Sequence, residues 1–92
     1  MVDCDEAQCR LQGEITLGNA ASILDELKPR IAKKVPLLDF SGVAQVDSTA
    51  LALILSCMRE AEQQNYRLRL SGLPTSITTL ADLYGVAPFL HP

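Results

Sequence analysis

Residues 35–40, VPLLDF, form the short apolar run that constrains the fold most strongly. A run of this length is too short for a helix and is typical of a central strand of a sheet. We expect a first helix before this strand, with Asn19 as its N-cap. Pro29 should kink this helix or end its regular part, because proline lacks an N–H donor. After it, we expect a turn and then a second helix that follows Asp47. The apolar positions of the first helix are Ala20, Ile23, Leu24, Leu27 and Ile31.

Two further segments, 9–15 and 66–70, alternate between apolar and polar residues, as strands with one buried face do. We expect residues 1–7 to form at most a short first strand or to be frayed. A last helix should begin near Pro74 and have its C-cap at Gly85. The residues expected to face the core are Cys9, Leu11, Gly13 and Ile15 in the first strand, Tyr66, Leu68 and Leu70 in the second, and Ile77, Leu80, Ala81 and Tyr84 in the helix.

Strands and helices therefore alternate along the chain, which predicts an α/β fold with a mostly parallel sheet. The 92 residues suffice for one domain, spanning 1–92. Because two of the strands alternate rather than being apolar throughout, helices should cover mainly one face of the sheet.

The composition argues against several classes of function. The net charge is −3, no Trp is present, and the Lys and Arg residues are scattered, so a nucleic-acid partner is not expected. No stretch approaches the roughly 20 apolar residues that span a bilayer, and no secretory leader is recognisable. We expect a cytoplasmic protein.

The three cysteines lack CxxC spacing. Cys4 and Cys9 have no second Cys or His pair with which to complete a metal site. We therefore expect reduced thiols, with no disulfide and no bound metal.

The hydroxyl pair Ser48 and Thr49, directly after Asp47, is the main candidate site. Residues of this kind at a helix start can cap the helix, receive a phosphate or face a partner protein. Asp47 could equally provide the cap, so the sequence leaves these uses open.

The second helix predicts a surface for docking a partner. Helical spacing places its core stripe at Leu51, Ile54, Leu55, Met58 and Ala61. The opposite face is short of the Lys, Glu and Gln that usually cover an exposed helix, which favours a protein contact. That face consists of Thr49, Leu53, Ser56, Cys57 and Glu60.

Catalysis is poorly supported. His91, the only histidine, stands next to the end of the sequence, and no Gly-rich phosphate loop is present. Asp39 ends the central strand, where it more simply accepts hydrogen bonds from the following turn. We therefore expect neither an enzyme nor a cofactor.

The stretch LDFSGVAQVDSTALALIL, residues 38–55, resembles the strand–turn–helix signature of STAS domains, the fold of bacterial anti-sigma factor antagonists. The resemblance implies a mixed, mostly parallel sheet with helices mainly on one face. It also implies that Ser48 or Thr49 is a phosphorylation site within a surface that binds an anti-sigma kinase.

Within this family, the chain is more similar to the small STAS subunits of Mla-type phospholipid-transport ABC complexes. The stretches LQGEITLGNAASIL, residues 11–24, and GLPTSITTLADLYGVAPFL, residues 72–90, carry this likeness. It implies a non-enzymatic subunit at the cytoplasmic side of the inner membrane that binds the ABC ATPase through the helix starting at Ser48. The partner-binding residues expected on this basis are Asp47, Ser48, Thr49, Leu53, Ser56 and Cys57.

Overall fold

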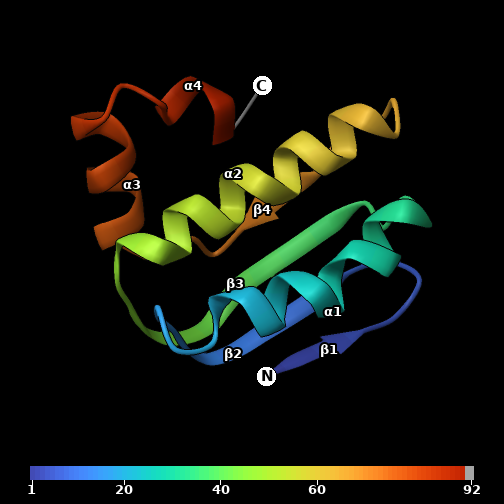
Figure 1. Cartoon of the computed structure of the whole chain (residues 1–92), viewed down its shortest axis with the longest axis horizontal. Coiled ribbons are helices and arrows are strands. Elements are labelled where there is room, and N and C mark those ends of the chain that lie inside the picture. Colours follow the sequence, from blue (N-terminus) through green and yellow to red (C-terminus); the bar gives the residue numbers. More distant parts are fainter. Residues whose placement is uncertain (91–92) are drawn as a thin grey trace.

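A computed structural model describes residues 1–90 and shows a four-stranded sheet in the order β1-β2-β3-β4 (Figure 1). Strand β1 pairs antiparallel with β2, whereas β2 pairs parallel with β3 and β3 parallel with β4. The expected mixed, mostly parallel sheet is thus confirmed. The strands are β1 (Val2–Cys4), β2 (Cys9–Ile15), β3 (Leu37–Val46) and β4 (Arg69–Ser71).

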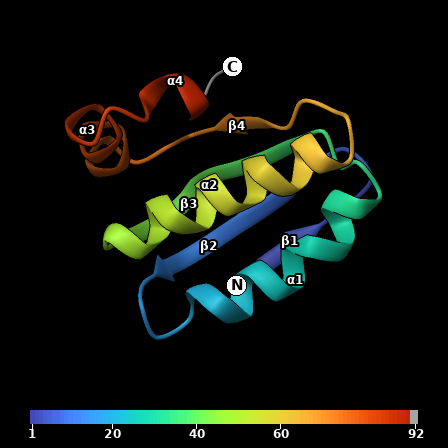
Figure 2. The ribbon, with the colours of Figure 1, turned by 45° about the horizontal axis from the view of Figure 1, so that its top comes forward.

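Helices α1 (Ala20–Ala32) and α2 (Ser48–Gln63) lie side by side on one face of this sheet (Figure 2). Helix α3 (Thr75–Leu83) and the short α4 (Ala87–Leu90) follow β4 and pack against α2. The prediction that helices cover mainly one face is therefore confirmed, whereas α4 was not foreseen.

Strand β2 follows the predicted alternation. Cys9, Leu11 and Ile15 are buried, and the polar residues between them are exposed. Gly13, expected to face the core, is instead exposed and has a φ of 85°, a left-handed conformation that glycine adopts readily. The register with β3 shifts next to it, so an irregular pairing removes this position from the alternation.

Strand β3 continues to Val46, where the sequence predicted a turn. Between its pairings with Arg10 and Gln12 of β2 it advances from Asp39 to Gly42, so it contains an extra residue. A second shift follows further along the pair. Because of these irregularities, the polar, glycine-containing segment after Phe40 still pairs with β2. Phe40 is the last buried residue of the strand.

Helix α1 has Asn19 as its N-cap residue and runs through Pro29 to Ala32. Pro29 therefore does not end it. The carbonyl of Pro29 accepts a hydrogen bond from the N–H of Lys33 at 3.2 Å, so the last turn closes in the normal way. The helix buries Ile23, Leu27 and Ile31 against the sheet and α2, as predicted.

At the other end of the chain, α3 buries Ile77 and Ala81, as expected. Tyr84, predicted to face the core, is 63% exposed. Gly85 follows it with a φ of 71° and ends the helix, as expected of the glycine at this position.

The structure corrects the prediction of reduced thiols. Cys4 and Cys9 are directly opposite each other in the β1–β2 pair and are joined by a disulfide, whereas Cys57 is free and buried. The spacing of five residues did not reveal this bond because it depends on the hairpin register. β1 itself is short, as the sequence suggested.

Candidate functional site

Asp47 provides the cap of α2. Its Oδ1 accepts hydrogen bonds from the backbone N–H of Thr49, at 2.9 Å, and from the Thr49 hydroxyl. Of the three uses left open for the hydroxyl pair, capping is thus carried out by Asp47. The Thr49 hydroxyl is engaged in this cap as a hydrogen-bond donor. Ser48, the first residue of the helix, is exposed.

The same carboxylate joins the start of α2 to the loop between β2 and α1. Its Oδ2 accepts a hydrogen bond from the backbone N–H of Leu17 at 3.0 Å, and the Asp47 N–H donates to the carbonyl of Ile15 at 3.2 Å. Within the loop, Asn19 Oδ1 accepts from the Thr16 N–H and its Nδ2 donates to the Glu14 carbonyl, both at 2.9 Å. The loop and the helix start therefore form one surface.

These hydrogen bonds favour the ionised form of the carboxyl. The Thr49 hydroxyl, and next the Leu17 N–H, hold the pKa of Asp47 below its usual value. The group therefore carries a full negative charge at neutral pH beside the Ser48 hydroxyl.

The predicted phase of α2 is correct for Leu51, Ile54 and Ala61, which are buried, and wrong at four other positions. Leu53 is only 4% exposed and Cys57 is fully buried, whereas Leu55 and Met58 are only partly buried. Two neighbours cause this difference, because α2 packs on the sheet and also against α1, which widens its buried arc. Leu53 and Cys57 are core residues here, and burial raises the pKa of the Cys57 thiol to about 12. Neither side chain is available to a partner.

The exposed side of α2 near its start consists of small, uncharged residues. Ser48 and Ala52, one turn apart, are exposed, and Ser56 is half-buried a turn later. Leu17, whose N–H is bound by Asp47 at the start of the helix, is 80% exposed. We call this set the Ser48 surface: Leu17, Asp47, Ser48, Thr49, Ala52 and Ser56.

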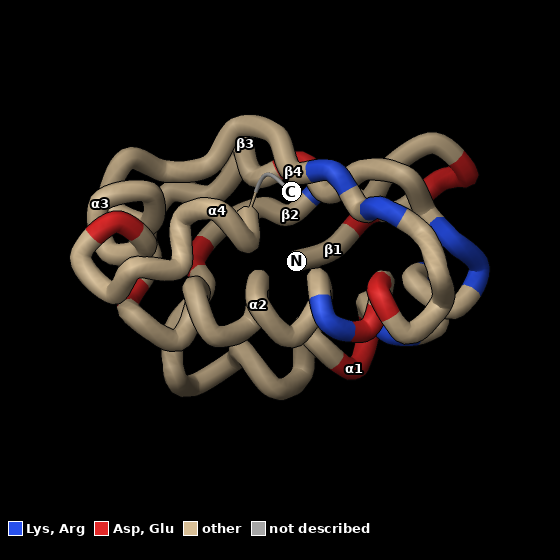
Figure 3. Tube along the Cα trace, turned by 90° about the horizontal axis from the view of Figure 1, so that it is seen from above, with Lys and Arg blue, Asp and Glu red and all other residues tan. Residues whose placement is uncertain are grey.

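Leu17 and Ala52 were missed from the sequence. The signal for Leu17 was a lone apolar residue in the polar segment TLGN, where a loop residue facing water would usually be polar. Figure 3 shows that Lys and Arg are gathered away from α3, and residues 35–58 contain none. The Ser48 surface is therefore poor in positive charge.

Other residues considered for chemistry have structural roles or lie elsewhere. Asp39 Oδ1 accepts hydrogen bonds from the Ser41 N–H at 2.9 Å and from the Ser71 hydroxyl at 3.3 Å, and its Oδ2 lies 3.8 Å from Nε of Arg10. The Ser41 N–H is the main reason for its lowered pKa. His91 lies outside the described residues.

The part of the chain that the structure describes contains neither a cluster of metal ligands nor a membrane-spanning helix. Across residues 1–90, no three His, Cys, Asp or Glu side chains are grouped so as to hold a metal ion. In the same residues, no helix has the length and apolar character needed to cross a membrane.

Comparison with known proteins agrees with the sequence patterns. Residues 3–91 match the family described as Mlab, STAS domain. The intermembrane phospholipid transport system binding protein MlaB of Escherichia coli (strain K12) is 33% identical over 67 residues, which cover 73% of this chain and 69% of that protein. MlaB of Shigella flexneri matches with the same identity and coverage.

Solved structures with the same fold include the anti-sigma factor antagonist SpoIIAA. Its unphosphorylated form superposes with a TM-score of 0.72 at 21% identity, covering 97% of this chain and 83% of that one. The phosphorylated form of this Bacillus cell fate determinant gives a TM-score of 0.69 at 20% identity, covering 97% and 86%. The fold, the family match and the MlaB relatives agree, and the chain belongs to the STAS domain family of the MlaB type.

Proposed function

We propose that this chain is a non-enzymatic subunit of an Mla-type ABC phospholipid transporter and binds its MlaF-like ATPase through the Ser48 surface. The observation that carries the proposal is this surface itself, an exposed patch of small and apolar side chains at the start of α2 in a relative of MlaB. The subunit works at the cytoplasmic side of the inner membrane, held there by its partner, and supports the assembly and activity of the ATPase.

The chemistry of the Ser48 surface suits a protein contact. Ala52 and Ser48 lack long side chains, so a partner can approach the helix closely and immobilise few rotamers. Leu17 offers an apolar anchor, and the Asp47 hydrogen bonds hold its backbone in place before binding. Apart from Asp47, whose charge is engaged in these hydrogen bonds, the surface is uncharged, as the centre of an interface usually is.

Substitutions at exposed positions test the site without touching the core. Ala52→Arg and Ser48→Glu should each weaken binding to the purified ATPase about tenfold or more, because each places a charge in a contact that excludes water. Binding is measured by isothermal titration. Leu53→Arg would not serve, because Leu53 is buried.

Ala32→Arg is the matched control. It makes the same chemical change at an exposed position at the C-terminal end of α1, outside the Ser48 surface, and should leave the affinity unchanged. Circular dichroism establishes that all three variants are folded. Full-strength binding by both Ala52→Arg and Ser48→Glu would refute this surface as the ATPase site.

A second candidate function is an anti-sigma factor antagonist controlled by phosphorylation at Ser48 or Thr49. It is favoured by the structural likeness to SpoIIAA and by the exposed hydroxyl of Ser48. The Thr49 hydroxyl donates to Asp47 and is half-buried, so Ser48 is the better placed acceptor. A phosphate there would add about −1.5 to −2 charges beside Asp47, enough to repel an acidic or apolar partner.

Phosphate transfer distinguishes the two functions. The chain is incubated with ATP and a candidate anti-sigma kinase and then analysed by mass spectrometry. The antagonist function predicts one phosphate that is lost in Ser48→Ala and retained in Thr49→Val. An unmodified chain across the candidate kinases would reject this alternative and leave the transporter proposal in place.

A further inference from the structure

A groove of about 670 Å³ lies between the outer side of α2, the segment that leads into β4, and α4. Figures 1 and 2 show α4 beside α2. Volumes of 300–1,000 Å³ are typical of sites for single small ligands. The walls of the groove are apolar and are formed by Leu55, Met58, Leu68, Val86 and Phe89.

The groove explains the exposure of apolar residues that the sequence assigned to the core. Leu55 and Met58 belong to the stripe predicted to be buried, yet the sheet and α1 cover other positions of α2. Phe89 closes one side of the groove and is 63% exposed. These side chains leave apolar surface in water that a ligand would cover favourably.

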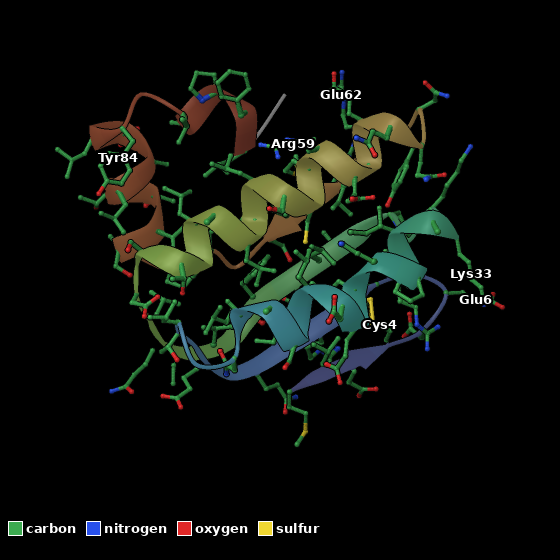
Figure 4. The ribbon with its side chains drawn as sticks, in the orientation of Figure 1. Cys4, Glu6, Lys33, Arg59, Glu62 and Tyr84 are labelled. Carbon is green, nitrogen blue, oxygen red and sulfur yellow. A yellow bond between two sulfur atoms is a disulfide. The ribbon has the colours of Figure 1, made fainter. Side chains whose placement is uncertain are left out.

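Two cations lie at the rim of the groove. Arg59 comes from α2 and Arg67 from the segment before β4, and both are exposed. Among the described residues, Glu62 is the only carboxylate in the lining, so these rim residues have a net charge of +1. Within residues 1–90, Arg10 and Asp39 form the sole ion pair, so neither rim arginine has an acidic partner there. Figure 4 shows Arg59 and Glu62 on the side of α2 that faces away from the sheet.

One hydroxyl is buried behind the lining of the groove. Tyr66 lines the groove, and its Oη is buried without a hydrogen-bond partner among the described residues. This oxygen has no surface open to the groove, so the polar contacts available to a ligand there come from the two rim arginines. Burial, and next the neighbouring Cys57, raises the pKa of Tyr66 to about 12, so the hydroxyl stays a neutral donor at physiological pH.

We propose that this groove binds a small anionic amphiphile, a single aliphatic chain ending in a carboxylate. The aliphatic chain lies against Leu55, Met58 and Phe89, and the carboxylate is bound at Arg59 and Arg67. Arginine suits this role because its guanidinium donates two parallel hydrogen bonds to a carboxylate. The site is separate from the Ser48 surface, and the proposal does not depend on the transporter function.

The lining favours a small molecule over a peptide. An extended peptide gains affinity by adding a strand to an open sheet edge, but residues 69–71 of β4 do not line the groove. The walls are instead side chains of α2 and α4 and of the segments that precede β4 and α4. They supply apolar contact and positive charge, the two features that an amphiphilic acid requires.

The test titrates the 92-residue chain with dodecanoate below its micelle concentration and follows backbone amide shifts by NMR. We expect saturable shifts around residues 55–68 and 86–90. Dodecyltrimethylammonium, with the same tail and the opposite charge, should bind at least about tenfold more weakly. Butanoate, with the same head and a short tail, should also bind at least about tenfold more weakly because each buried CH₂ contributes to affinity.

Variants assign the two parts of the ligand. Arg59→Gln combined with Arg67→Gln should weaken dodecanoate binding about tenfold and abolish the preference over the cationic amphiphile. Arg30→Gln, a matched charge change at an exposed position of α1, should leave the affinity unchanged.

Three results would overturn the proposal. They are the absence of saturable shifts with dodecanoate, shifts confined to other elements, and equal affinity for the acid and the cationic amphiphile. If the groove amides shift only when the ATPase is added, a protein occupies the groove and the amphiphile assignment is wrong. Full-strength ATPase binding by Ala52→Arg, which counts against the Ser48 surface, would leave this result unaffected, so the two proposals can be distinguished.

Discussion

Asp47 is the residue on which the geometry of the candidate site depends. One carboxylate oxygen caps α2 through Thr49, and the other binds the N–H of Leu17 in the preceding loop. Because Asp47 performs the capping, the hydroxyl of Ser48 remains exposed for contact or modification. A single side chain thus fixes the helix start and positions the apolar Leu17 beside it.

Asp47→Ala should lower the melting temperature more at neutral pH than in acid. Since the pKa of Asp47 is lowered in the folded protein, its stabilising effect is fully present above the unfolded value of about 3.9. The effect is lost as the pH falls through the folded pKa. Thermal unfolding of both proteins at pH 7 and near pH 2 measures this difference.

Asp3→Ala, at an exposed position of β1 outside the capping network, serves as the comparison for Asp47→Ala. An equal loss of melting temperature from Asp47→Ala at both pH values would show that the carboxylate charge is not involved.

Leu53 and Leu55 exchange the roles that their spacing predicted. Leu53→Ala should reduce the free energy of unfolding by roughly 2–5 kcal/mol, because it removes a buried side chain from a packed core. Leu55→Ala should reduce it by less, since Leu55 is only partly buried and lines the groove. Urea unfolding of the two variants gives both values, and a larger loss for Leu55→Ala would return α2 to its predicted phase.

At the scale of elements, the patterns that depend on neighbours in sequence were predictable. The alternation in β2, the buried positions of α1 and the start of α2 after Asp47 all follow from local spacing. The phase of α2 did not, because the helix packs on the sheet and also against α1, and Leu53 and Cys57 are buried. The continuation of β3 to Val46 depends likewise on pairing with β2, which no local pattern records.

The disulfide between Cys4 and Cys9 attaches β1 covalently to β2. It closes a short loop, so reduction should lower the free energy of unfolding by about 2 kcal/mol. Urea unfolding with and without a thiol reductant measures the effect. The double variant Cys4→Ala, Cys9→Ala should show no response to the reductant, and a wild-type chain equally insensitive would argue against the bond.

At the scale of the whole molecule, positive charge is distributed unevenly. All eight Lys and Arg residues lie outside residues 35–58, so the start of α2 is free of positive charge, whereas Arg59 and Arg67 border the groove. In Figure 4, Tyr84 stands away from the sheet, near the end of α3. The sequence alone could place the hydroxyl pair at a helix start. It could not reveal Leu17 beside that pair or the groove, because both require the packing of distant segments.

Hydrogen exchange of the chain, alone and bound to its ATPase, tests the central claim most directly because it maps the contact without any substitution. We predict slower exchange on binding at residues 16–19 and 48–52, with unchanged exchange in β1 and β4. Protection confined to the groove or to the open face of the sheet, with residues 16–19 and 48–52 unaffected, would contradict the assignment of the Ser48 surface as the docking site.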